Sequence, residues 1–193
     1  MLASITPLGE RGRQSRWGIT VVAFLLGALA AGAGAGAALG ALGSLVPPGP
    51  DPDARLAVLA LAAVVAILLD LAPGAAPGPR RQVDERWLDE YRGWVYGLGY
   101  GWQLGLGLTT VVSSAATYVA FLAALLSGSP AAGAIILGVF GAVRGLTPLA
   151  AASVRTPGRL VAFHRRLVRW RSPVRWGAIA TQAGALALAL ALS

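Results

Sequence analysis

The chain has 193 residues, of which 56% are apolar, 12% are charged and 26 are glycine. A soluble domain normally carries about 25% charged residues, and the mean hydropathy of +0.67 is too high for a surface that faces water. The absence of cysteine and the single histidine exclude disulfides, thiol redox chemistry and multi-histidine metal sites. The composition therefore predicts an integral membrane protein, all-α and without a cofactor.

Five apolar stretches predict a single transmembrane domain that covers residues 1–193. A helix needs about 20 apolar residues to cross the hydrocarbon core of a bilayer. The expected crossings are residues 17–46, 56–73, 93–126, 131–152 and 176–192.

The basic residues predict the orientation of these crossings. The formal charge is +8, and all sixteen basic residues are arginine. Three precede the first crossing, four lie in the loop 74–92 and seven lie in the segment 154–175. Arginine-rich loops stay in the cytoplasm, so we expect a multi-pass protein of the cell membrane with a cytoplasmic N-terminus and an external C-terminus. Topology explains this charge, and nucleic acid is not an expected partner. No cleavable signal is expected, because the first 16 residues hold no apolar run.

The segment 158–171 has the pattern of an interfacial helix. Apolar residues recur in it at helical spacing among arginines, which is typical of a helix that lies among the headgroups of anionic lipids. The residues expected to contact headgroups are Arg165, Arg166, Arg169 and Trp170.

The third apolar stretch, residues 93–126, is too long for one straight crossing. Its 34 residues would span about 51 Å as a helix, at about 1.5 Å per residue, whereas the hydrocarbon core is about 30 Å thick. We expect a break or a sharp tilt between Gly99 and Gly107.

Glycines recur every fourth residue in three of the crossings. In lipid, close backbone approach across small residues drives much of the packing between helices, so these ladders predict a compact bundle. An unwound segment that lines a cavity, as in transporters with broken helices, is the alternative for residues 99–107. The ladder residues are Gly32, Gly36, Gly40, Gly93, Gly97, Gly101, Gly105, Gly141 and Gly145.

Polar side chains inside the crossings form the candidate pathway for a substrate. Hydroxyl groups in the third crossing fall at the spacing of one helix face, which favours either packing between helices or a hydrated pathway. Asp70 and Arg144 are the two charges inside crossings, at similar expected depths; they either pair or reach the headgroups separately. If Arg144 is unpaired, it is a site for an anion or a lipid phosphate. The candidate pathway residues are Asp70, Gln103, Thr110, Ser114, Thr117, Tyr118 and Arg144.

Two short motifs, Ser4-Ile5-Thr6-Pro7-Leu8 and Gly105-Leu106-Gly107-Leu108-Thr109-Thr110, carry a resemblance to a known family. They resemble the breaks at which the transmembrane thiol-reductant and cytochrome c biogenesis family (CcdA and DsbD type, within the LysE-like transporter group) carries its reactive cysteines. The resemblance implies only a shared scaffold. Separately, Ile5-Thr6-Pro7 matches Leu71-Ala72-Pro73 and Leu146-Thr147-Pro148, which end two crossings, and this leaves open a further helix upstream of Met1 and a division into two inverted three-helix halves. This chain has no cysteine, so neither the thiol relay nor any catalytic residue of the family is carried over.

Two functions remain open from the sequence. The first is a small transporter or permease-like protein for a small anion or another small solute. The second is a non-catalytic accessory or assembly subunit that packs against a second copy or another membrane protein. An enzyme is not expected, because the crossings hold no nucleophile beside a base and no metal cluster.

Overall fold

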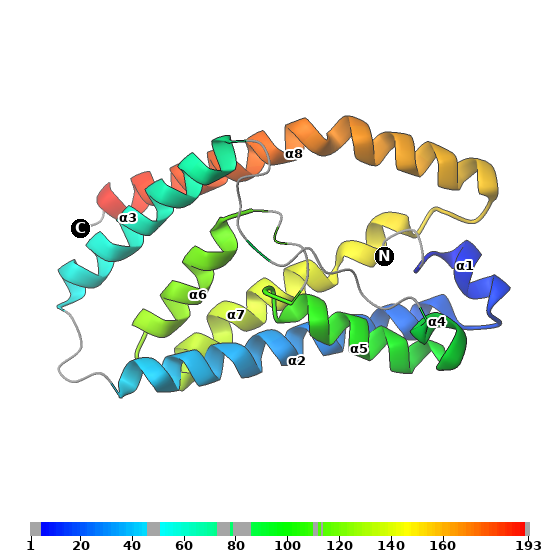
Figure 1. Ribbon diagram of the computed structural model, residues 1–193, viewed down its shortest axis with the longest axis horizontal. Helices are drawn as coiled ribbons and strands as arrows, with labels where there is room; N and C mark the ends of the chain where they lie inside the picture. The colour runs from blue at the N-terminus through cyan, green and yellow to red at the C-terminus, as the bar shows by residue number, and fades with distance from the viewer. Residues whose placement is uncertain are drawn as a thin grey trace.

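The computed structural model describes residues 5–45, 51–72, 78, 86–109, 112 and 114–191. Every regular element within these ranges is a helix (Figure 1). The elements are α1 (Pro7–Gly12), α2 (Trp17–Ser44), α3 (Pro52–Leu71), α4 (Trp87–Glu90), α5 (Gly93–Gly105), α6 (Ala116–Leu126), α7 (Pro130–Gly145), the 3₁₀ helix η1 (Thr147–Ala151) and α8 (Pro157–Ala191). Among the described residues, three helical segments are long and apolar enough to cross a membrane: Trp17–Ser44, Pro52–Leu71 and Pro130–Ala151.

Helix α2 is the centre of the molecule, with α5 and α7 packed against it. Its contacts with α7 are made through glycine. A methyl group added at Gly36 would lie 2.6 Å from the carbonyl carbon of Gly133, and one added at Gly40 would lie 2.6 Å from that of Ser129. As residue numbers rise along α2 they fall along α7, so the two helices are antiparallel. Their backbones touch, which only glycine permits at these positions.

Helix α5 packs against the first half of α2 in the same way. A methyl group at Gly101 would lie 2.7 Å from the carbonyl carbon of Phe24, and one at Gly105 would lie 2.7 Å from the Cα of Ala28. Gly97 likewise faces the backbone of Thr20. Here the residue numbers rise together, so α5 runs parallel to α2.

The third apolar stretch is interrupted, as its length predicts, but the interruption begins later than expected. Helix α5 continues through Gly99 to Gly105 and ends there, and α6 begins at Ala116. Within it, Gly97, Gly101 and Gly105 lie against the backbone of α2, and Gly99 lies against the ring of Trp87. Gly107, with a φ of 71°, takes the left-handed conformation just beyond the helix end, which is typical of a glycine that terminates a helix. The two half-helices follow one another along α2 (Figure 1).

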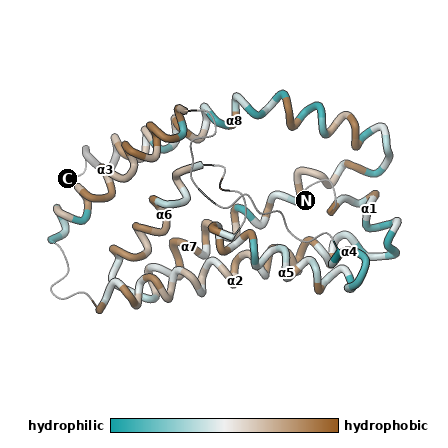
Figure 2. The backbone as a smooth tube through the Cα atoms, in the orientation of Figure 1, coloured by the Kyte–Doolittle hydropathy of each residue, from teal (hydrophilic) through white to brown (hydrophobic). Residues whose placement is uncertain are grey.

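Helix α8 corrects a second expectation. The interfacial helix 158–171 and the crossing 176–192 were expected as separate elements, but Pro157–Ala191 is one helix of 35 residues. Pro173 lies inside it; proline removes one backbone donor, but its fixed φ is helical, so the chain continues as a helix. Figure 2 shows the first half of α8 as a mixture of hydrophilic and hydrophobic residues. The second half lies beside α3.

Candidate functional site

The carboxylate of Asp70 lies at the point where the third apolar stretch resumes its helix. Asp70 is in the last turn of α3. Its two oxygens accept hydrogen bonds from the Ser114 hydroxyl at 2.6 Å and from the Ala115 backbone N–H at 2.8 Å. A carboxylate at this position satisfies unpaired N–H groups of a helix N-terminus and interacts favourably with the helix dipole. Asp70 therefore joins the end of α3 to the start of α6.

Helix α8 completes this cluster with two side chains. The Gln182 amide donates to the Asp70 carboxylate at 3.0 Å. The Arg175 guanidinium donates to two backbone carbonyls at the end of α3, those of Asp70, at 2.8 Å, and of Leu71. Arg175 thus caps the carbonyls that a helix C-terminus leaves without partners. Helices α3, α6 and α8 therefore meet at this cluster.

Asp70 and Arg144 form no direct ion pair, although such a pair was one of the alternatives for these charges. The Asp70 carboxylate is satisfied by α6 and α8, as described above. The Arg144 guanidinium lies over the ring of Phe140, at 5.3 Å from the ring centroid, and its buried Nε has no hydrogen-bond partner. A similar depth in two helices does not bring side chains together when each helix turns them toward different neighbours.

Phe140 links Arg144 to the interruption in the third stretch. The Phe140 ring lies edge-on to that of Phe121 of α6, with centroids 6.4 Å apart. The same two rings flank Gly107, where an added methyl group would lie 3.0 Å from Phe140 and 3.2 Å from Phe121. The guanidinium of Arg144 therefore stacks on a ring that lines the interruption.

The remaining candidate pathway residues do not form one helical face. Ser114 precedes α6, so helical spacing does not extend from it to Thr117 and Tyr118, and Thr110 lies outside the described residues. Thr117 is buried, and the backbone carbonyl of Gln103 accepts a hydrogen bond from the Thr109 hydroxyl at 2.5 Å. The predicted hydroxyl stripe is thus wrong as a continuous face, because the helix is interrupted within it.

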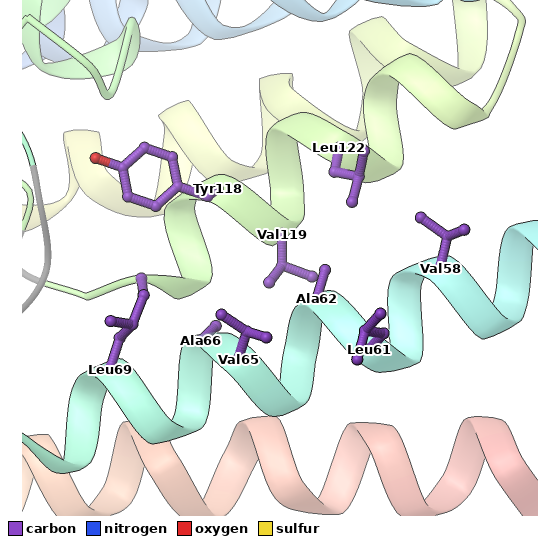
Figure 3. A pocket seen from close by; sticks show the side chains of 10 residues that line it. Val58, Leu61, Ala62, Val65, Ala66, Leu69, Tyr118, Val119 and Leu122 are labelled. Carbon is purple, nitrogen blue, oxygen red and sulfur yellow. The ribbon is translucent and has the colours of Figure 1, made fainter.

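An apolar groove of about 370 Å³ lies between α3 and α6 (Figure 3). Tyr118 lies near one end of it, close to Leu69, and Val58 and Leu122 lie toward the other. The remaining lining residues are Leu61, Ala62, Val65, Ala66, Ala115 and Val119. The only polar side chain on this wall is that of Tyr118, so the groove accepts apolar groups.

The buried carboxylate of Glu10, in α1, was not anticipated from the sequence. It is fully buried and accepts hydrogen bonds from Tyr96 at 2.6 Å, Thr20 at 2.7 Å and Arg13 at 2.8 Å. These bonds tie α1 to the starts of α2 and α5. The sequence does carry a sign of helix α1, because Thr6 is followed by proline, as at many helix starts. In the structure the Thr6 hydroxyl accepts a hydrogen bond from the Gly9 N–H at 3.0 Å.

The expected headgroup contacts lie on the first half of α8. Arg165, Arg166, Arg169 and Trp170 are all exposed. The Arg166 guanidinium lies 5.8 Å from the centre of the Trp170 ring. The side chains are thus available to a surface, whether of lipid or of protein.

Among the residues that the structure describes, no group of three or more His, Cys, Asp or Glu side chains could hold a metal ion. No protein family model matches the chain, and neither a curated protein nor a solved structure matches it.

Proposed function

We propose that this chain is a five-crossing membrane protein that moves a small solute past its interrupted third crossing. The crossings are α2, α3, the pair α5 and α6, α7 with η1, and the second half of α8. The N-terminus is cytoplasmic, because the arginine-rich segments then share that side. The three segments long and apolar enough to span a bilayer support the membrane assignment.

The interruption between α5 and α6 is the observation that carries the transport proposal. Discontinuous membrane helices are the usual way in which transporters place backbone polar groups at a substrate site within the bilayer. Here the interruption meets a carboxylate, that of Asp70, and a guanidinium, that of Arg144, beside the lining ring of Phe140. Ionisable groups at such positions are costly and mark solute or ion pathways.

A small anion is the solute that this arrangement favours. Arg144 has a buried Nε without a hydrogen-bond partner, and a bound anion would supply one. The N-terminus of α6 is itself an anion site, and the Asp70 carboxylate occupies it. A transported anion would bind to Arg144.

Flux into proteoliposomes tests this proposal. The purified protein is reconstituted and offered a panel of small anions, including chloride, nitrate, phosphate and acetate. We expect uptake of at least one anion and its loss in Arg144→Gln, with normal uptake in the matched variant Arg11→Gln, whose side chain is exposed on α1. No uptake of any anion by the unaltered protein would overturn the proposal, and full uptake by Arg144→Gln would remove Arg144 from the pathway.

An accessory or assembly role is the second candidate, and the exposure of α3 favours it. Ala66 is the only buried residue of this 20-residue helix, while Leu61 is 66% and Leu68 is 60% exposed. The exposed apolar side chains of this helix can contact a protein partner as well as lipid. Under this proposal the protein co-purifies with a second copy or another membrane protein, and bulky polar changes on α3 release that partner; a monomer that transports alone would exclude it.

The basic first half of α8 is proposed to bind anionic lipid at the cytoplasmic face. Its arginines are exposed, as are most of its apolar residues. Lys and Arg near a membrane surface each contribute about 1 kcal/mol to binding of anionic lipid. Reconstitution efficiency should therefore rise with the content of anionic lipid and fall with added salt; no dependence on either would contradict the proposal.

A further inference from the structure

The apolar groove between α3 and α6 has the length of one half of a bilayer. Its α3 wall runs from Val58 to Leu69, which is about 16 Å at about 1.5 Å per residue. The hydrocarbon core of a bilayer is about 30 Å thick, so the acyl chains of one leaflet extend over about 15 Å. Because α3 is long and apolar enough to cross a membrane, the groove would run in the direction of these chains. Its length therefore matches that of one acyl chain.

The groove is also open along its side and apolar along its length. On its α3 wall, Leu61 is 66% and Val65 is 48% exposed. All of its lining residues except Tyr118 are apolar, and its volume of about 370 Å³ is within the range of ligand-binding clefts. An acyl chain can therefore enter the groove directly from the bilayer, without passing a charged group of the lining.

One end of the groove lies beside a cation. Figure 3 shows Leu69 and Tyr118 at this end, with the Tyr118 hydroxyl oxygen pointing away from the other lining side chains. Helix α3 ends just beyond, where the Arg175 guanidinium donates to the carbonyls of Asp70 and Leu71. Tyrosine is enriched where the hydrocarbon of a membrane meets the headgroups. This end of the groove is therefore suited to the headgroup of a lipid.

Arg175 retains hydrogen-bond donors for an anion. A guanidinium carries more N–H donors than the two that Arg175 gives to the carbonyls of α3. The Asp70 carboxylate does not pair with it, because its oxygens accept from a hydroxyl, a backbone N–H and an amide instead. Arg171 lies one helical turn before Arg175 in α8, so these two side chains share a face of the helix. The two guanidinium groups outweigh the single carboxylate, and arginine binds phosphate through parallel N–H donors.

We propose that this protein binds one anionic phospholipid, with an acyl chain in the groove between α3 and α6 and the phosphate at Arg175. The site differs from the exposed first half of α8, because a groove of defined length holds the chain and one lipid fills it. The proposed topology places the end of α3, and with it the phosphate, at the cytoplasmic face. Binding of the lipid depends neither on that orientation nor on transport. The bound chain covers part of α3 and links this exposed helix to α6.

Native mass spectrometry of the protein released from detergent micelles tests the headgroup and the stoichiometry. The micelles contain equal amounts of phosphatidylglycerol and phosphatidylcholine with the same acyl chains. We expect one retained lipid, enriched several-fold in phosphatidylglycerol, in the unaltered protein and in Arg11→Gln, which removes an exposed arginine of α1. Arg175→Gln should lose this preference. Equal retention of the two lipids by the unaltered protein, or displacement of the lipid by glycerol phosphate, which has no acyl chain, would overturn the proposal.

The same measurement tests the groove with a matched pair of substitutions that leave Arg175 in place. Ala62→Phe fills the groove, whereas Ala57→Phe adds the same ring at an exposed position of α3 outside it. We expect Ala62→Phe to retain several-fold less phosphatidylglycerol than Ala57→Phe. Equal retention by the two variants would overturn the placement of the chain in the groove. A dimer without lipid would assign the groove to a second copy of the chain and would also overturn the proposal.

Cysteine labelling locates the acyl chain, and the cysteine-free chain permits it. Val65 lines the groove, whereas the neighbouring Val64 does not, and the two are similarly exposed, at 48% and 41%. The ratio of the labelling rates of Val65→Cys and Val64→Cys by a membrane-permeant maleimide removes general effects of the lipid on the reagent. We expect phosphatidylglycerol to lower this ratio several-fold relative to phosphatidylcholine, and Arg175→Gln to abolish the difference. The same ratio in both lipids would overturn the proposal. Neither method requires flux, so a protein without transport can still show the bound lipid.

Discussion

Replacing Gly36 by alanine should separate α2 from α7, whereas the same change at Gly34 should not. A methyl group at position 36 would lie 2.6 Å from the carbonyl carbon of Gly133 and 3.0 Å from the Cβ of Leu137. Position 34, half a turn away on the same helix, has nothing within 4 Å. The two substitutions are chemically identical and differ only in the direction that the new methyl group takes.

The size of the effect follows from these distances. Carbon atoms in favourable contact are about 3.5–4.0 Å apart, so the backbones at Gly36 and Gly133 must separate by about 1 Å. That movement also weakens the neighbouring contacts of Gly32 and Gly40 with α7, because all three glycines lie on one row. Overpacking of this kind costs about 1–3 kcal/mol. Alanine gains up to about 1 kcal/mol of helix propensity over glycine, but both variants share that gain. We therefore expect Gly36→Ala to be less stable than Gly34→Ala by about 1–3 kcal/mol.

Unfolding in mixed micelles, with increasing denaturing detergent and tryptophan fluorescence as the signal, measures this difference. The chain has six tryptophans, which makes the signal strong. Circular dichroism should confirm that both variants start with the same helix content. Equal stabilities for Gly36→Ala and Gly34→Ala would refute the close contact between α2 and α7.

Three further experiments test the Glu10 cluster, the interruption after α5 and the membrane topology. Glu10→Ala removes the acceptor of the buried Tyr96 hydroxyl and leaves the Thr20 hydroxyl only the Arg16 carbonyl, at 3.4 Å. An unsatisfied buried group costs about 1–3 kcal/mol, so Glu10→Ala should lower the free energy of unfolding by about 1–4 kcal/mol. Glu90 is exposed, so Glu90→Ala should change it by less than about 0.5 kcal/mol; equal losses would contradict the buried cluster. Gly107→Ala and Gly128→Ala both place a side chain at positive φ, at a cost of about 1–2 kcal/mol. Only position 107 is crowded by aromatic rings, so Gly107→Ala should show the larger loss of stability in the same titration. The reverse order would count against the described interruption between α5 and α6. In the loop 74–92, only a reporter that works in the cytoplasm should be active. After the last residue, only a reporter that works outside the cell should be active. Activity of the external reporter at the loop would refute the proposed topology.

Composition and local pattern were sufficient to predict the helical, membrane-type architecture. Apolar runs bounded by proline, glycine and serine identify where helices begin and end, as at Ser129-Pro130, where the serine side chain accepts a hydrogen bond from the Ala132 N–H at 3.4 Å. The excessive length of the stretch 93–126 was enough to predict an interruption. These properties depend on residues close together in the chain, so the sequence contains the information directly.

The partners of the charges inside the crossings were not predictable in this way. A pair between Asp70 and Arg144 was one expectation from the sequence, because both are charges at similar expected depth. The actual partners of Asp70 lie 44 residues away, at Ser114, and 112 residues away, at Gln182. Ser, Gln and backbone N–H groups occur throughout the chain, so nothing in the local pattern marks the ones that will meet a carboxylate.

The burial of Glu10 likewise depends on residues far apart in the chain, and α8 is a single helix where two elements were expected. A glutamate among arginines at the start of a chain is normally solvated, and it is buried here only because Tyr96, which lies 86 residues away, is carried to it by the packing of α5 on α2. The sequence by itself determined which segments are helical and apolar, through local propensity and hydropathy. Only the tertiary structure decided which helix faces meet, because the direction of each side chain around its helix depends on contacts between segments far apart in the chain.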